Sequence, residues 1–294
     1  RRARAEFILP VPMGSPQDYF GIATLCANSG ACTQVTGATG SVLASQGFWG
    51  SILTKGAQRA NGDAYSTYYN SGAPGGLNAA YDDKGYSYVV EFPPGTVNGA
   101  VWIFDPVFCA TGRKTANPNA GQRLGVGDFW YSTAGTRNVT TEFKLWDMLG
   151  TPYTSSDDLL IASDNGLFAN MDNVDKGPSF AGDQNYGAGY NGSGSNGCQS
   201  GSAHPSSAFH NTWWLLATGL GAGQYRLQVV TGGGSTSQNA NNEFGIQVTS
   251  PLGGGRIYGQ SRMCAYINVV GTSLFYLAQV DAVHAGKTLE IRLF

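Results

Sequence analysis

Residues 213–227, WWLLATGLGAGQYRL, decide the fold class. Apolar residues fill the first half, the glycine-rich centre GLGAG follows, and the second half alternates apolar with polar side chains. The expected inward set of that second run is Tyr225, Leu227 and Val229, and the outward set is Arg226 and Gln228. A period of two indicates a strand with one buried face. The stretch as a whole predicts two strands and a tight turn, which is the pattern of a β-hairpin.

Similar runs continue along the chain from residue 86. Strands are expected in YSYVVEF, GAVWIFDPVF, FWYST, TTEFKLWD, DLLIAS, NTWWLLAT, QYRLQVVT and NEFGIQVTS. Turn residues separate these runs, and long amphipathic helical patterns are missing. The sequence therefore predicts an all-β protein built as an antiparallel, jelly-roll-like β-sandwich.

The chain divides into three predicted parts. Residues 1–80 are expected to be an irregular arm and lead-in, in which FWGSILTKG forms one or two helical turns. Residues 81–250 are the predicted sandwich. SPLGGGR then reads as a hinge, and residues 256–294 are expected to begin a second, incomplete β domain.

Composition restricts the classes of function. Only 12% of the residues are charged, while the chain holds 43 glycines and 12% aromatic residues. This balance is typical of β-rich extracellular proteins rather than of cytoplasmic enzymes. A net charge of -2 argues against nucleic acid, which binds basic surfaces. No apolar run reaches the roughly 18 residues of a spanning helix, so no membrane span is expected in this chain.

Five cysteines suggest an oxidising compartment. Cys26 and Cys32 flank an Asn-Ser-Gly centre that can turn the chain back on itself, so they are expected to pair. Cys109 and Cys198 are the second predicted disulfide. Cys264 lies inside an expected strand and is interpreted as a buried free thiol.

Catalytic motifs are missing from the sequence. It contains neither G-x-S-x-G nor H-E-x-x-H, and its three histidines lie in or near loops without acid–base or metal spacing. A non-catalytic protein is therefore expected.

Carboxylates are the strongest candidates for a ligand site. Asp147 ends one expected strand, and Asp157 and Asp158 begin the next, so loops at one end of a sandwich would bring them together. Asp105 is a further candidate. Calcium binds several oxygen ligands of this type, and calcium is the one cofactor that the sequence suggests. The alternative is ordinary turn capping by Asp.

Aromatic clusters raise a second ligand hypothesis. FWYS and NTWWL offer flat apolar rings with polar groups, which suit sugars, whereas packing in the core is the alternative. Trp213 and Trp214 are adjacent, so in a strand they face opposite ways. One of the two is therefore a candidate for exposure.

Several motifs resemble a known family. RANGDAYSTYYN, VWIFDPVFCATG, FYLAQVDAVHAGKTLEIRLF and the pattern W-x-L-A…L-x-x-G-x-Y-R-L together resemble the extracellular regions of TadE/TadG-like tight-adherence (Flp) pilus-assembly proteins. The similarity runs from about residue 45 to residue 294. In that family a membrane-anchored segment precedes tandem β-sandwich domains. Residues 86–250 are also similar, more weakly, to the prepeptidase C-terminal sandwich of secreted hydrolases.

These observations together predict a secreted or surface-displayed bacterial protein with a structural or adhesive role. It is expected to be pilus-associated, or to assemble with copies of itself or with other surface proteins into a filament or surface layer. The alternative is a carbohydrate-binding accessory module of a secreted hydrolase, with glycans as partners.

Two segments are candidates for assembly. KTLEIRLF reads as an edge strand with Leu289, Ile291 and Leu293 on one face, and an open edge invites association. The stretch EFILPVPM has the features of a donor strand: it is extended, apolar and contains Phe7, Ile8 and Leu9. Donation from one copy to the next is a head-to-tail contact, which would build a filament.

Overall fold

The computed structural model describes residues 17–21, 24–26, 32–34, 36–40, 48–53, 84–105, 129–131, 140–151, 154–163, 212–232, 239–260, 265–267 and 282–289. Within them the chain forms strands β1 to β14 and one short 3₁₀ helix, Ala282–His284. No helix of this described part is long and apolar enough to cross a membrane.

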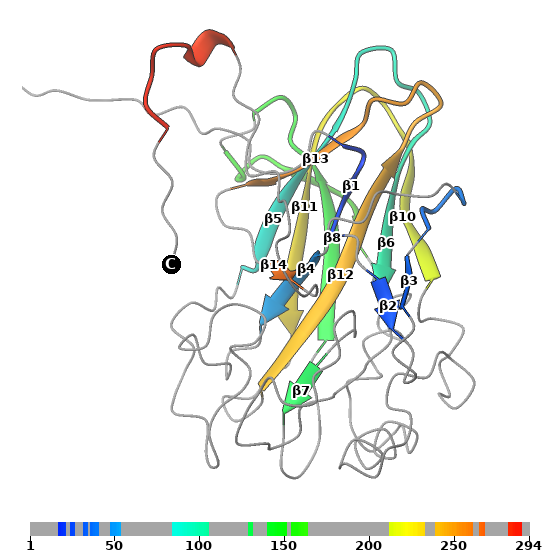
Figure 1. The fold of residues 1–294 in the computed structure, drawn as a ribbon. Coiled ribbons are helices and arrows are strands. Elements are labelled where there is room, and N and C mark those ends of the chain that lie inside the picture. The colour runs from blue at the N-terminus through cyan, green and yellow to red at the C-terminus, as the bar shows by residue number, and fades with distance from the viewer. Residues whose placement is uncertain are drawn as a thin grey trace, which may run out of the picture.

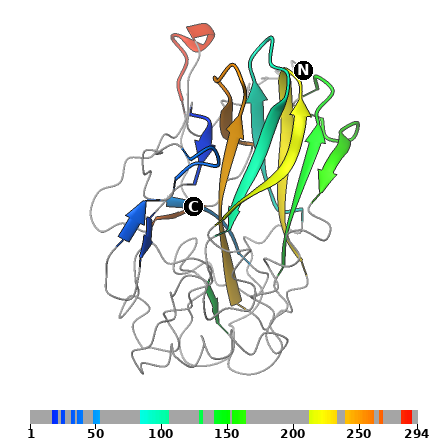
Figure 2. The ribbon, with the colours of Figure 1, turned by 90° about the vertical axis from the view of Figure 1, so that its right-hand side faces the viewer.

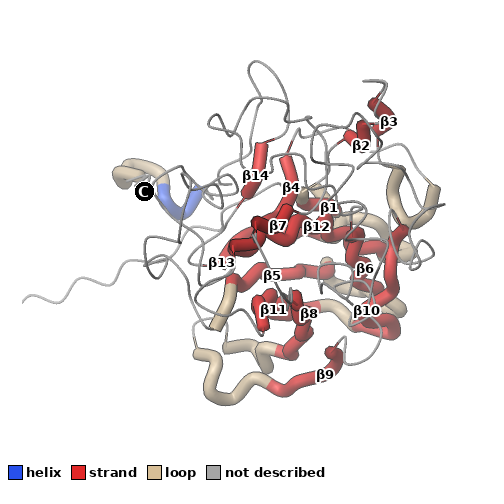
Figure 3. Tube along the Cα trace, turned by 90° about the horizontal axis from the view of Figure 1, so that it is seen from below, coloured by secondary structure: helices blue, strands red, loops and turns tan. Residues whose placement is uncertain are grey.

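Two antiparallel sheets pack face to face (Figure 1; Figure 3). The five-stranded sheet has the order β13 (Arg256–Gln260), β5 (Tyr86–Phe92), β11 (Gly223–Gly232), β8 (Thr140–Asp147) and β9 (Leu159–Ser163). The path of the seven-stranded sheet is β10 (Thr212–Leu220), β6 (Gly99–Asp105), β12 (Asn239–Thr249), β4 (Phe48–Leu53) and β14 (Ala265–Ile267). Two more strands, β1 (Tyr19–Phe20) and β7 (Phe129–Tyr131), also pair with β12, while β2 (Thr24–Cys26) and β3 (Cys32–Gln34) form a ladder of their own. The prediction of an all-β sandwich is confirmed.

The core fills the space between the two sheets. Tyr88 of β5 lies edge-on to Phe244 of β12, with ring centroids 5.8 Å apart, and Phe143 of β8 meets the same ring at 5.4 Å. Around them pack the predicted inward set Tyr225, Leu227 and Val229, together with Ile246 and Val248 of β12. In β11 the period of two therefore identifies the face that packs in the core.

Residues 213–227 do not form the predicted hairpin. β10 pairs with β6, whereas β11 pairs with β5 and β8, so the short link at Gly221 and Ala222 crosses from one sheet to the other. Trp214 and Leu216 of β10 pack against the core from one side, while Tyr225 and Leu227 of β11 pack from the other. Facing strands can bury both apolar sets at once, which explains the crossing.

The segment predicted to be helical is strand β4, a partner of β12. Gly50 of β4 lies directly opposite Phe244, and a Cβ at position 50 would overlap the Phe244 ring. The glycine therefore lets the aromatic ring lie against the strand backbone, and tertiary packing overrides the local helical pattern.

The strands after residue 256 belong to the first sandwich. β13 pairs with β5 in one sheet, and β14 pairs with β4 in the other. The expected start of a second domain at 256 is therefore wrong for β13 and β14. Further along, the 3₁₀ helix and a turn at Gly286, φ +78°, precede Leu289, which is 47% exposed and not in a strand. Ile291 and Leu293 lie outside the described residues.

Candidate functional site

The loops at one end of the sandwich contain the predicted carboxylates. Gly223 pairs with Phe92, and two residues along β11, Tyr225 pairs with Asp147. The link after β5, the link before β11 and the loop after β8 therefore share this end, and the β8–β9 hairpin lies at one side of the molecule (Figure 2).

A tight turn follows Asp147. The amide of Thr151 donates to the carbonyl of Met148 at 2.8 Å, and the two central residues have positive φ, 47° at Leu149 and 75° at Gly150. Two positive φ values characterise a type I′ turn, which favours Asn-Gly rather than Leu-Gly. Asp147 Oδ1 accepts a hydrogen bond from the amide of Leu149 at 2.9 Å. The loop therefore holds an apolar, 55% exposed Leu149 in a conformation that leucine rarely adopts.

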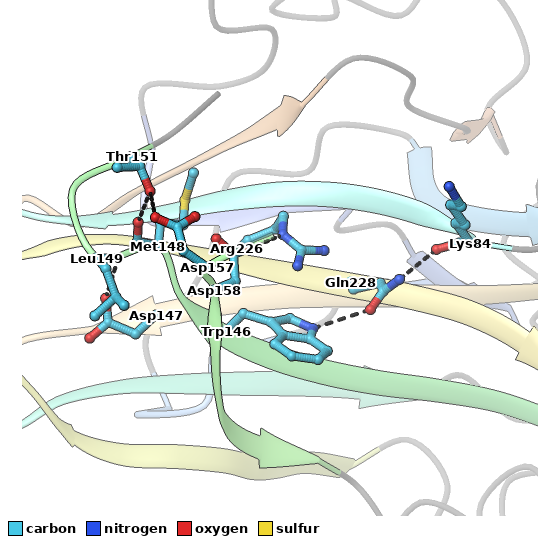
Figure 4. A network of polar contacts seen from close by, with 10 residues as sticks. All are labelled: Lys84, Trp146, Asp147, Met148, Leu149, Thr151, Asp157, Asp158, Arg226 and Gln228. Atoms are coloured by element: carbon cyan, nitrogen blue, oxygen red, sulfur yellow. Dashed lines mark hydrogen bonds and ion pairs between the residues drawn. The ribbon is translucent and has the colours of Figure 1, made fainter. Parts of the chain in front are cut away.

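Asp157 is tied to this turn. Thr151 Oγ1 lies 2.8 Å from the carbonyl oxygen of Met148 and 2.9 Å from Asp157 Oδ2 (Figure 4). Its hydroxyl donates within the loop, so the Asp157 carboxylate has a neutral protein partner. Because the carboxylate is exposed, its charge also faces solvent.

Asp158 forms a buried ion pair across the sheet. Arg226 Nε of β11 donates to Asp158 Oδ2 at 2.6 Å, and the side chains are 11% and 1% exposed. The guanidinium carbon lies 5.2 Å from the ring centroid of Trp146, whose Nε1 donates to Gln228 Oε1 at 3.1 Å (Figure 4). Asp158 Oδ1 is buried without a hydrogen-bond partner. Alternation placed Arg226 on the outer face correctly, but the loop that covers it comes from 68 residues away and left no local signal.

The four carboxylates predicted for calcium are not all together. Asp147, Asp157 and Asp158 belong to one loop, and each has its own protein partner. Asp105 is the last residue of β6 and pairs with Thr212 of β10. Gly99, the first residue of β6, lies at the end of the sandwich that holds the other three carboxylates. Asp105 is six residues from Gly99, which is about 20 Å along the strand. In the described part of the chain no three His, Cys, Asp or Glu side chains are grouped to hold a metal. Calcium binding stays a prediction, which melting with and without a chelator would test.

The cysteine predictions are placed only in part. β2 and β3 pair antiparallel with Cys26 opposite Cys32, so the chain turns back as expected. Cys109, Cys198 and Cys264 lie outside the described residues. Both disulfides stay predictions.

The strongest surface feature is strand β9, at the edge of the five-stranded sheet. It pairs with β8 on one side, and no described strand pairs with its other side. Leu159, Leu160 and Ile161 are 56%, 43% and 39% exposed, and the strand has no charge and no proline. Ala162 pairs with Leu145 and Leu160 with Trp146, which leaves Ile161 as a bulged residue. The sequence predicted this strand but not its position at the edge of the sheet. The signal in the sequence that could have indicated an unusual strand is the run of three consecutive apolar residues, Leu159–Ile161.

An aromatic strip occupies the outer face of the seven-stranded sheet over β6 and β10. Trp102 lies between the buried Val101 and Ile103, so its ring is on the outer face, and it pairs with the 40% exposed Leu215. Its Nε1 donates to Thr249 Oγ1 at 3.0 Å. Trp213 packs on Phe104 with ring centroids 5.3 Å apart, and its Nε1 donates to the carbonyl of Thr36 at 2.6 Å. Both indoles are partly exposed and held in place.

A polar network links β13, β5 and β11 of the five-stranded sheet, toward the edge opposite β9. Glu91 Oε2 accepts hydrogen bonds from Tyr258 Oη at 2.6 Å and from Gln224 Nε2 at 2.9 Å. Burial, together with the hydrogen bond to Glu91 and its charge, raises the pKa of Tyr258 well above its ordinary value. Burial also raises the pKa of Tyr225, and the charge of Asp147 adds to that rise. Both phenols therefore hold their protons into the alkaline range.

Comparisons with protein-family models, with curated proteins and with solved structures found no match.

Proposed function

We propose that this chain is a non-catalytic structural or adhesive protein of the bacterial surface, which associates through open β edges into a filament or surface layer. The observation that supports this is β9, an apolar and uncharged strand whose outer edge has no described partner. The resemblance to the extracellular regions of tight-adherence pilus proteins supports a pilus-associated role. The low charge content supports an extracellular location.

An edge of this kind favours association on energetic grounds. No described strand pairs with its outer backbone N–H and C=O groups, and main-chain hydrogen bonds from an added strand would supply affinity. Covering the exposed parts of Leu159, Leu160 and Ile161 would contribute about 1 kcal/mol each. Natural edges are commonly protected by charge, proline or a bulge, and β9 has only the bulge at Ile161.

Electron microscopy and light scattering of the purified chain test the proposal. The wild-type protein should form filaments or large assemblies as its concentration rises, and Leu160→Lys should remain monomeric because a charge then lies on the edge. Leu252→Lys is the matched control, since Leu252 is 65% exposed but lies in the loop between β12 and β13. A wild-type chain that stays monomeric at all concentrations contradicts the proposal.

The second candidate is a carbohydrate-binding module, which the aromatic strip of Trp102 and Trp213 favours. Partly exposed indoles whose N–H groups are already bonded offer fixed apolar faces to a sugar ring. Titration with soluble polysaccharides should then quench tryptophan fluorescence, and Trp102→Ala should abolish the quenching. Unchanged fluorescence across a broad panel of glycans argues against this candidate.

A further inference from the structure

The charges around β9 restrict what can bind to its edge. Asp147 and Asp157 lie at the start of the strand, and within the described residues they accept hydrogen bonds only from the amide of Leu149 and the hydroxyl of Thr151. Neither carboxylate has a cation beside it there. At the far end, Lys144 pairs across the ladder with Ser163, but it forms an ion pair with Glu142 at 2.8 Å. The edge is therefore acidic at its start, apolar in its middle and nearly neutral at its end.

One segment of this chain has the complementary order. Residues 1–9, RRARAEFIL, place three arginines and Glu6 before an apolar run, so the side chains of the segment are net basic, and they lie outside the described residues. If Arg4 is aligned with Asp157, the run Phe7–Leu9 falls beside Leu160, Ile161 and Ala162. Only a parallel orientation has this property, because an antiparallel segment would carry its arginines to the Lys144 end.

We propose that residues 1–9 of a second copy add as a parallel strand to the open edge of β9. This rests on the proposed function and names the partner of the same edge. The arginines would meet Asp147 and Asp157, which have no cation partner among the described residues, and the apolar run would cover Leu160 and Ile161. Pro10, which lacks an N–H group, would fall beside Ser163, the last residue of β9. The added strand therefore ends where β9 ends.

Strand addition of this type is directional. The arm of one copy and the edge of the next are different surfaces, so the contact is head-to-tail and propagates. The acceptor is β9, rather than the terminal KTLEIRLF stretch that the sequence suggested.

The test separates binding from assembly. A variant lacking residues 1–13 serves as the receptor, and a fluorescent synthetic peptide of residues 1–13 is titrated into it by anisotropy. Saturable binding is expected, weakened at least tenfold by Leu160→Lys in the receptor and several-fold by Asp157→Asn or by high salt. Leu252→Lys should leave the affinity unchanged. Circular dichroism confirms that each receptor is folded.

Each outcome has a distinct meaning. A peptide that fails to bind the receptor, while the full chain still forms filaments, overturns the inference and leaves the proposed function standing. Peptide binding to the receptor alongside a monomeric full chain that rejects the peptide means that each arm covers its own edge, which overturns the assignment to a second copy. Binding unaffected by Leu160→Lys places the arm elsewhere and also overturns it.

Discussion

Replacing Asp158 by Asn should destabilise the fold strongly, although it changes only a few atoms of a surface loop. The substitution keeps the shape of the side chain but removes the negative charge that faces Arg226 Nε at 2.6 Å. Arg226 is 11% exposed, so its guanidinium loses its counterion without gaining full hydration. The ring of Trp146 remains beside it and compensates for part of the loss.

The magnitude follows from the burial of the pair. Two unit charges about 4 Å apart attract by about 4 kcal/mol at an effective dielectric constant near 20. Removing one member of a buried pair costs about 3–5 kcal/mol. The remaining exposure of Arg226 and its contact with Trp146 place Asp158→Asn at the lower end, about 3 kcal/mol. For a chain of this size that corresponds to a fall in melting temperature of roughly 6–12 °C.

Urea unfolding at pH 7, followed by tryptophan fluorescence, measures this loss. Asp157→Asn is the matched control, because its carboxylate is exposed and bonded to Thr151, so a change within about 1 kcal/mol is expected. The double variant Asp158→Leu with Arg226→Met should recover most of the stability, since replacing a whole buried pair by apolar groups is often neutral. A loss below about 1 kcal/mol for Asp158→Asn, or a double variant no more stable than the single one, would refute the reasoning.

Three further predictions concern single positions. Gly85→Ala should destabilise by at least about 2 kcal/mol in urea unfolding, because φ is +71° and an added Cβ would overlap a carbonyl of β11; unchanged stability would contradict that geometry. Leu149→Asn should raise the free energy of unfolding by about 0.5–1 kcal/mol by relieving the type I′ turn, and a fall would show that Leu149 is not strained. The pKa values of Tyr225 and Tyr258 are raised in the folded protein. The contribution of these phenols to the free energy of unfolding is therefore fully present below pH about 10 and is lost as the pH rises through the folded pKa. Tyr258→Phe should therefore reduce the loss of stability between pH 9 and 11, and an identical pH profile would exclude Tyr258 as a contributor.

Alternation along the chain predicts strands and faces but not sheets. The predicted strands at 86–92 and 140–147 match β5 and β8, since their apolar sets have one side to bury. The pattern at 213–227 is equally compatible with a hairpin and with two strands in facing sheets, because both arrangements bury the same side chains. The sheet assignment depends on pairing with β6 and β5, which lie more than a hundred residues earlier in the chain.

The candidate site was predictable in its residues but not in its contacts. The SDD sequence marks Asp157 and Asp158 as unusual charges in a poorly charged chain. Which cation or amide each carboxylate meets depends on long-range packing, as the contact from Asp158 to Arg226 shows. The edge position of β9 is also invisible locally, because it depends on which strands the rest of the chain brings to the sheet.

The Asp158–Arg226 pair also positions the edge on which assembly is proposed to depend. Asp158 immediately precedes Leu159, the first residue of β9, and its partner lies two strands away on β11. The pair therefore fixes the start of an edge strand that, among the described strands, has backbone pairing on one side only. An ordered acceptor strand binds more tightly than one that must be ordered during binding. Hydrogen exchange of Asp158→Asn should show faster exchange in β9 than in β11, whereas Val229→Ala, a core variant, should raise exchange in both strands together. Equal protection of β9 in the wild-type protein and in Asp158→Asn would separate the ion pair from the edge, and the pair would then contribute to global stability alone.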